Sequence, residues 1–140
     1  HPDHDAVAFA VQKARRILRE AGEAAPAVAE MTGYHGGQDG MEVNSFLPHE
    51  EVQPVAVPLS AAARALKQKM IACFETQRPV LQHFPVGGSE CLRVAPRYDF
   101  TRPPHPGPLF YERHRWGMSG AEFRQNVVAA LDALFLRSAA

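Results

Sequence analysis

Apolar residues recur at three- and four-residue spacing in several stretches of the chain, which is typical of amphipathic helices. The first stretch follows Asp5, and Gly22 is a suitable residue to end it. The second begins at a Ser60 cap and is expected to end near Gln77, because Pro79 disfavours helical backbone at the residue before it. The apolar positions of these two predicted helices are Ala6, Val7, Ala10, Val11, Ala14, Ile17, Leu18, Leu66, Met70, Cys73 and Phe74.

A third helix is predicted near the end of the sequence. Ser119, with Glu122 three residues later, fits a capping box, in which each side chain accepts a hydrogen bond from the other residue's backbone N–H. An apolar stripe follows at helical spacing: Phe123, Val127, Val128, Leu131, Leu134 and Phe135. These features together predict a helix that packs one side against a core.

Short apolar segments between these helices are typical of strands. Residues 27–31, 41–47 and 53–57 are expected to be extended, with turn chemistry at 33–37. The proline-rich region 79–117 is expected to be a long ordered loop with short strands around 92–94 and 109–111. Helices alternating with short strands predict an α/β layer structure.

The composition fits a globular protein of one domain or slightly less. The 140 residues are 46% hydrophobic, and 15 basic side chains balance 15 acidic ones. This balance argues against nucleic acid or a membrane surface as partner, and no apolar run is long enough to span a bilayer. The first residue is not Met, and we expect a processed, truncated or partly observed protein without a signal peptide.

The two cysteines, Cys73 and Cys91, favour a reduced, cytoplasmic setting, with one disulfide as the alternative. Cys73 falls on the apolar face of the second predicted helix, where a buried thiol is the usual arrangement. The sequence does not decide whether the chain forms a homo-oligomer.

The chain opens on His1-Pro2-Asp3-His4-Asp5, immediately before the first predicted helix. Two imidazoles three residues apart can point into one small volume if the backbone turns into a helix there. The carboxylates suit a helix N-terminus, and one beside a histidine can fix its tautomer and support its imidazolium form. A solvated helix cap is the alternative. A closed tetrahedral zinc site cannot be built from this motif and two unplaced cysteines, so the residues indicate half a site.

His1-Pro2-Asp3-His4-Asp5-Ala6 resembles the second signature of the LmbE-like de-N-acetylase superfamily, which includes the N-acetylglucosaminyl-phosphatidylinositol de-N-acetylases. Residues 65–77 are similar to a family helix with a Lys…Leu-x-Cys-Tyr-x-Ser-Gln pattern, with Phe74 at the aromatic position and Thr76 at the serine. Residues 90–100 and Phe123-Arg124 also resemble family segments. The likeness covers most of the chain, but the family's first motif, Ala-His-Pro-Asp-Asp-Glu, is absent from it.

The resemblance implies the C-terminal portion, residues 1–140, of a single Rossmann-like three-layer deacetylase domain whose N-terminal strands are missing. In such enzymes Zn²⁺ takes two ligands from the first motif and the last His of the second, which is His4 here. The resemblance makes His1 the catalytic histidine and Asp3 the residue that orients it. The implied reaction is removal of an acetyl group from an N-acetylglucosamine-type amino sugar or conjugate by metal-activated water. We expect the 140-residue chain alone to be inactive.

Three further residues are candidates for substrate binding. His35 follows a probable strand, Gln77 lies at a helix end, and Arg97 belongs to a polar and aromatic cluster. The alternative explanations, favoured for His35 and Arg97, are a surface-loop histidine and a surface ion pair, and a polar helix terminus explains Gln77 equally well.

Tyr111, His114 and Trp116 form either a sugar-stacking patch or the packing beneath an irregular segment. Two alternative functions stay open. One is a zinc amidase acting on another amide conjugate. The other is a non-catalytic sugar-binding domain that has lost the metal site.

Overall fold

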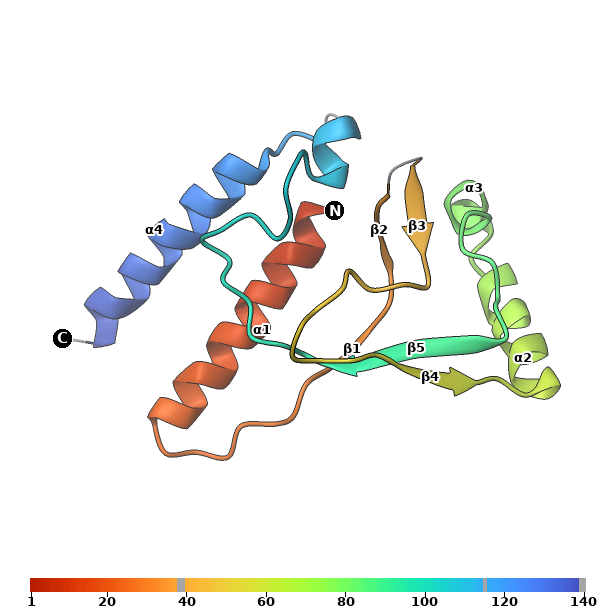
Figure 1. Ribbon diagram of the computed structural model, residues 1–140, viewed down its shortest axis with the longest axis horizontal. Helices are drawn as coiled ribbons and strands as arrows, with labels where there is room; N and C mark the ends of the chain where they lie inside the picture. Colours follow the sequence, from red (N-terminus) through yellow and green to blue (C-terminus); the bar gives the residue numbers. More distant parts are fainter. Residues whose placement is uncertain (38–39, 115, 139–140) are drawn as a thin grey trace. The chain divides into compact units, whose positions relative to one another are not determined.

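The structure is a computed structural model that describes residues 1–37, 40–114 and 116–138 (Figure 1). It contains two compact units, one formed by His1–Ala27 with Arg97–Ala140 and the other by Val28–Pro96. Helices and small antiparallel sheets are both present, so the mixed α and β composition expected from the sequence is confirmed. A Rossmann-like layering is not shown by these elements. Within the described residues, no helix has the length and apolar character needed to cross a bilayer.

The first unit begins with helix α1, Pro2–Glu20, which starts earlier than the Asp5 boundary expected from the sequence. His1 occupies the N-cap position, and Pro2 begins the helix because its fixed φ already suits the first turn. Imidazole is not among the usual capping side chains, which explains why the boundary was misplaced. Gly22 ends the helix as expected, since its φ of 76° is one that glycine adopts without strain.

The remaining elements of this unit are the 3₁₀ helix η2, Phe110–His114, and helix α4, Gly120–Ser138. The capping box before α4 is confirmed. Ser119 N–H donates to Glu122 Oε2 at 2.7 Å, and Glu122 N–H donates to Ser119 Oγ at 3.2 Å. The strand expected around 109–111 is wrong, because a backbone hydrogen bond from Glu112 to the Leu109 carbonyl closes a helical turn there.

The second unit is built on a three-stranded antiparallel sheet with strand order β1-β5-β4. Its strands are β1, Ala29–Met31, β4, Val55–Pro58, and β5, Ser89–Val94. A separate hairpin pairs β2, Tyr34–Gly36, with β3, Met41–Val43. The strands expected at 27–31, 41–47, 53–57 and 92–94 are therefore present with changed bounds, whereas the predicted turn at 33–37 contains β2.

One face of this sheet holds a buried guanidinium. Arg93 of β5 donates from Nε to Glu30 Oε2 and from Nη1 to the Leu47 carbonyl, both at 3.0 Å. The guanidinium also lies 4.1 Å from the centre of the Phe46 ring. Arg93 thus connects two strands and the segment after β3, and its charge is compensated where water is excluded.

The opposite face of the sheet is apolar and exposed. Strand register places Met31 and Val55 on either side of Leu92, and Val94 lies two residues further along β5. Met31, Val55 and Val94 are each more than 60% exposed. Among the side chains described, the buried apolar core consists instead of Leu109, Tyr111 and Val127 in the other unit.

Helix α2, Ala61–Ala72, begins at the Ser60 cap as expected, with Ala63 N–H donating to Ser60 Oγ at 3.1 Å. It ends before Gln77, and two short helices follow, η1, Glu75–Gln77, and α3, Arg78–Leu81. Pro79 lies in the first turn of α3, where proline is tolerated, so it starts a helix rather than only stopping one. Cys73 and Cys91 are free, and Cys73 is exposed rather than buried as predicted.

Candidate functional site

The first turn of α1 brings three predicted site residues together. The Nδ1 atom of His1 lies 3.2 Å from the backbone nitrogen of Asp3 and accepts its hydrogen bond. The same atom lies 3.4 Å from Asp3 Oδ2. The rings of His1 and His4 have centroids 5.9 Å apart and are tilted by 45°. The His-x-x-His spacing therefore places two imidazoles side by side at the helix start, as the sequence predicted.

The two contacts of His1 Nδ1 belong to different protonation states. As a lone pair, Nδ1 accepts from the Asp3 N–H; as a protonated nitrogen, it donates to the Asp3 carboxylate. The Asp3 side chain is 81% exposed and that of His1 40%, so solvent weakens the ion pair. Asp3 can thus orient and support a His1 imidazolium without locking it in that state.

A chain of aromatic ring contacts begins at His1. The Trp116 ring lies 5.1 Å from His1, and the His114 ring stacks on Trp116 at 5.1 Å with an interplanar angle of 23°. Phe110 contacts His114 at 4.5 Å and meets Trp116 edge-on at 6.0 Å. We call His1, His4, Phe110, His114 and Trp116 the histidine–tryptophan cluster. Its members come from the start of α1 and from the region of η2, and they belong to one unit.

Two groups near this cluster are shielded from water. Burial raises the pKa of the Asp5 carboxyl. Tyr111 is 3% exposed, and its hydroxyl is buried without a hydrogen-bond partner. Burial, together with the negative charge of Asp5, raises the pKa of Tyr111 to about 12. The start of α1 therefore lies near η2, and Tyr111 stays protonated at neutral pH.

Glu112 fixes the segment that carries the aromatic part of the cluster. Its Oε2 accepts from Leu109 N–H at 2.6 Å, and its Oε1 accepts from Gly120 N–H at 2.7 Å. These two donors hold the pKa of Glu112 below its usual range. Sequence reasoning missed this residue. The Leu109 contact has a capping-box spacing that could have indicated it, but the Gly120 contact has no local sequence signal.

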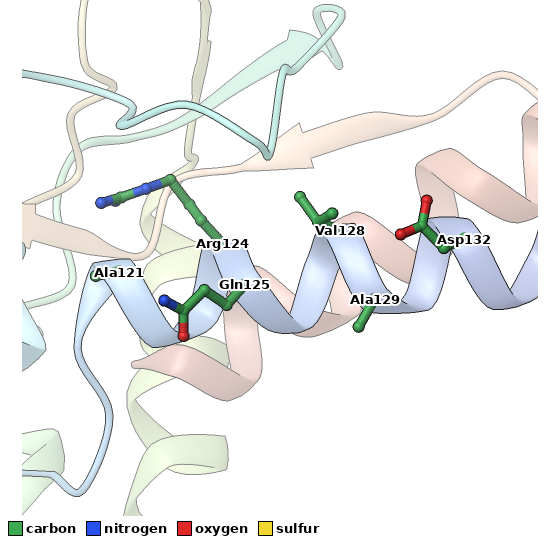
Figure 2. Close-up of a pocket in the computed structure, with 6 residues that line it drawn as sticks. All are labelled: Ala121, Arg124, Gln125, Val128, Ala129 and Asp132. Carbon is green, nitrogen blue, oxygen red and sulfur yellow. The ribbon is translucent and has the colours of Figure 1, made fainter.

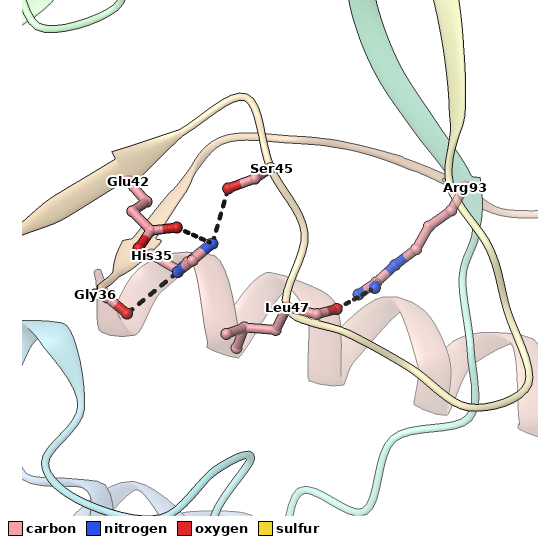
Figure 3. Close-up of polar contacts among 6 residues, drawn as sticks. All are labelled: His35, Gly36, Glu42, Ser45, Leu47 and Arg93. Atoms are coloured by element: carbon pink, nitrogen blue, oxygen red, sulfur yellow. Dashed lines mark hydrogen bonds and ion pairs between the residues drawn. The ribbon is translucent and has the colours of Figure 1, made fainter. Parts of the chain in front are cut away.

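His35 lies in the second unit, held by the β2–β3 hairpin and the residues after it (Figure 3). Its Nδ1 is 3.2 Å from the Gly36 carbonyl, so that nitrogen carries the proton and donates. Its Nε2 lies 3.0 Å from Ser45 Oγ and 3.7 Å from Glu42 Oε2. Both ring nitrogens are thus engaged within the unit, and the substrate role of His35 stays a prediction.

The other two predicted substrate residues are exposed. Gln77 lies in η1 of the second unit, where its backbone N–H donates to the Phe74 carbonyl at 3.0 Å. Arg97 is the first residue of the returning segment of the first unit. His35 and Gln77 thus belong to the second unit, whereas Arg97 and His1 belong to the first. Their roles remain predictions.

A shallow hollow runs along helix α4, lined by Ala121, Arg124, Gln125, Val128, Ala129 and Asp132 (Figure 2). All of these side chains come from a single helix, so the hollow lacks the opposing walls that enclose a ligand in a typical site. We therefore do not place the functional site there.

The donor atoms fit zinc in kind but not in number. Imidazole nitrogen is a common zinc ligand, and His4 supplies one. Across residues 1–37, 40–114 and 116–138, however, no three His, Cys, Asp or Glu side chains form a group able to hold a metal ion. A zinc site that includes His4 would therefore draw its other ligands from outside the described residues.

Known proteins do not extend this description. Comparisons with protein-family models, curated proteins and solved structures find no match for the chain. The case for a function therefore depends on the geometry around His1 and on the residues that resemble a family signature.

Proposed function

We propose that this chain is the C-terminal portion of a zinc-dependent hydrolase that removes the acetyl group from an N-acetylated amino sugar or its conjugate. The observation that carries the proposal is the arrangement of His1, Asp3 and His4 within one helical turn, with the two imidazoles 5.9 Å apart. A metal ligand beside a charged imidazole is the pairing that this hydrolysis needs.

His4 is the residue of this chain that would hold zinc, and its other ligands would come from a motif outside these 140 residues. Zinc, when bound, would activate water and polarise the amide carbonyl. The need for additional ligands agrees with the incomplete donor set among the described residues. It also accounts for our expectation that the chain alone binds metal weakly and has no useful activity.

His1 acts on the reacting amide. As an imidazolium supported by Asp3, it places positive charge beside the oxygen that becomes negative in the tetrahedral intermediate. The same ring can then give a proton to the departing amine nitrogen. Asp3 contributes by orienting the ring through its backbone N–H and, in the charged state, through its carboxylate.

The proposal also includes a Rossmann-like three-layer domain and a cytoplasmic location. A Rossmann-like three-layer domain would require strands in addition to the antiparallel sheets described here. The exposed apolar sheet face, including Met31 and Val94, would suit such additional structure. The free thiols of Cys73 and Cys91 suit a reducing, cytoplasmic setting.

A second candidate function is a sugar-binding domain without catalysis. The observation in its favour is the Trp116 ring, on which His114 stacks and which is 41% exposed. The sequence of the longer protein that carries this chain separates the two. A motif close to Ala-His-Pro-Asp-Asp-Glu after a strand supports the hydrolase, and its absence supports the binding domain.

The proposal is tested with the longer protein that carries this chain, by zinc content and by acetate release from N-acetylglucosamine derivatives. His4→Ala should lower zinc content and activity together. His1→Ala should keep most of the zinc and lower kcat by about 10²-fold or more, because it removes an acid–base and charge-stabilising group. His83→Ala is the matched control, since His83 is an exposed histidine of the second unit. Undiminished zinc and activity in His4→Ala would contradict the assignment.

A further inference from the structure

We propose that Trp116 is the platform on which the sugar ring of the substrate stacks, with its acetamido group directed toward His1. This inference rests on the proposed function and extends it by assigning the part of the site that recognises a pyranose. Its starting point is the ring contact between Trp116 and His1, whose centroids lie 5.1 Å apart. A ligand on the indole would therefore be a neighbour of the imidazole that acts on the amide.

The indole of Trp116 is both supported and accessible. His114 stacks on it and Phe110 meets it edge-on, so aromatic neighbours limit how the ring can rotate. Despite these contacts, 41% of the residue's surface is exposed. Tryptophan is highly buried on average, so a large ring held in place but left open to solvent is typical of a binding surface.

The chemistry around the ring favours a neutral sugar. A pyranose has a face of C–H groups that packs on an aromatic ring, while its hydroxyl and acetamido groups point outward toward polar partners. The imidazoles of His1 and His114, each in ring contact with Trp116, can supply such partners. The chain carries no net charge, which gives no support to a polyanionic ligand at the same place.

Hydrogen bonds also fix the backbone on either side of Trp116 in the sequence. The Glu112 carboxylate binds backbone N–H groups on both sides of the segment, at Leu109 and Gly120. Trp116 lies between these two positions in the sequence. Fixing the chain at both positions reduces the conformational freedom that the segment loses when a ligand binds, and this favours affinity even for a small sugar.

The test uses intrinsic fluorescence, because Trp116 is the only tryptophan of the sequence. The chain is titrated with N-acetylglucosamine in the presence of a metal chelator, and in parallel with acetamide, which lacks the pyranose. We expect a saturable change in Trp116 emission with N-acetylglucosamine, with an affinity in the millimolar range, and none with acetamide. Ligand-observed NMR then measures the same affinity in variants that lack the fluorophore.

Trp116→Ala should weaken N-acetylglucosamine binding by about tenfold, whereas Trp116→Phe, which keeps an aromatic face, should stay within about threefold of wild type. Phe74→Ala is the matched control, since Phe74 is a 60% exposed aromatic residue of the other unit, and it should bind as wild type does. Equal binding by wild type and Trp116→Ala, or a fluorescence response to acetamide alone, would overturn the platform.

Because the chelator removes zinc, sugar binding at Trp116 is measured separately from the proposed hydrolysis. If the longer protein binds the sugar through Trp116 but neither holds zinc nor releases acetate, the stacking role of Trp116 is supported and the deacetylase is refuted. If the longer protein binds zinc and releases acetate, and Trp116→Ala changes neither kcat nor KM, the deacetylase is supported and the stacking role of Trp116 is refuted.

Discussion

Among the residues around the histidine–tryptophan cluster, we expect Glu112 to contribute most to the free energy of unfolding. Glu112→Ala leaves the backbone N–H groups of Leu109 and Gly120, both in buried residues, without their acceptor. A hydrogen bond to a charged group contributes roughly 1.5–3 kcal/mol. Because the Glu112 carboxylate is itself partly open to solvent, we discount this value and expect a loss of about 2–3 kcal/mol for the pair. For a chain of this size the midpoint of thermal unfolding should fall on the order of 10 °C.

Trp116 fluorescence and far-UV circular dichroism together provide the assay, since the fluorophore lies four residues from the mutated position. Glu112→Gln should be intermediate, because its single carboxamide oxygen can accept from only one of the two N–H groups. Glu122→Ala is a useful comparison, as Glu122 also binds backbone at the start of α4 but is exposed, and its loss should be smaller. A midpoint for Glu112→Ala within 1–2 °C of wild type, on the order of experimental error, would show that the two hydrogen bonds contribute little.

The same residue predicts an acid dependence. The folded-state pKa of Glu112 is lowered, so its stabilising contribution is complete above its unfolded pKa and is lost as the pH falls through the folded pKa. The difference in the free energy of unfolding between wild type and Glu112→Ala should therefore be full at neutral pH and shrink below about pH 4. Urea titrations at several pH values measure this difference directly.

Three further substitutions test other parts of the structure. Gly120→Ala should destabilise by about 1 kcal/mol in urea unfolding despite alanine's better helix propensity, because the new Cβ would lie 2.8 Å from Leu109 Cδ1. Arg93→Met should cost roughly 2–4 kcal/mol by removing the guanidinium that pairs with Glu30, and adding Glu30→Gln should recover part of the loss. Tyr111→Phe should be neutral or stabilising by up to about 1 kcal/mol, since the hydroxyl has no partner to lose. In wild type the raised pKa of Tyr111 means that its contribution to stability is complete below pH 10 and is lost as the pH rises toward about 12. Urea unfolding over this pH range should show a smaller decline in Tyr111→Phe.

The elements that could be predicted from the sequence are those defined by local signals. Ser60 and the Ser119–Glu122 pair each cap a helix through contacts within three residues, and both helix starts were predicted correctly. The start of α1 was misplaced because His1 caps it, and histidine is rarely counted as a cap. The strand predicted at 109–111 was wrong because a turn closed by Glu112 replaces strand pairing.

In the candidate site, too, local contacts could be predicted from the sequence and long-range contacts could not. The proximity of His1, Asp3 and His4 follows from helical spacing and could be predicted. The contact between His1 and Trp116 joins residues 115 positions apart, and local pattern carries no information about it. Tyr111, His114 and Trp116 were predicted to form either a stacking patch or local packing, but the contact of Trp116 with His1 required the structure.

The exposed apolar face of the three-stranded sheet should affect how the protein behaves in solution. Met31, Val55 and Val94 form an apolar strip that is exposed to water. Each square ångström of this strip that a partner buries would contribute roughly 25 cal/mol to the free energy of association. At high protein concentration the strip should attract environment-sensitive dyes such as ANS and promote self-association. Lysine at the Val94 position should reduce both effects without touching the zinc-ligand or sugar-binding candidates.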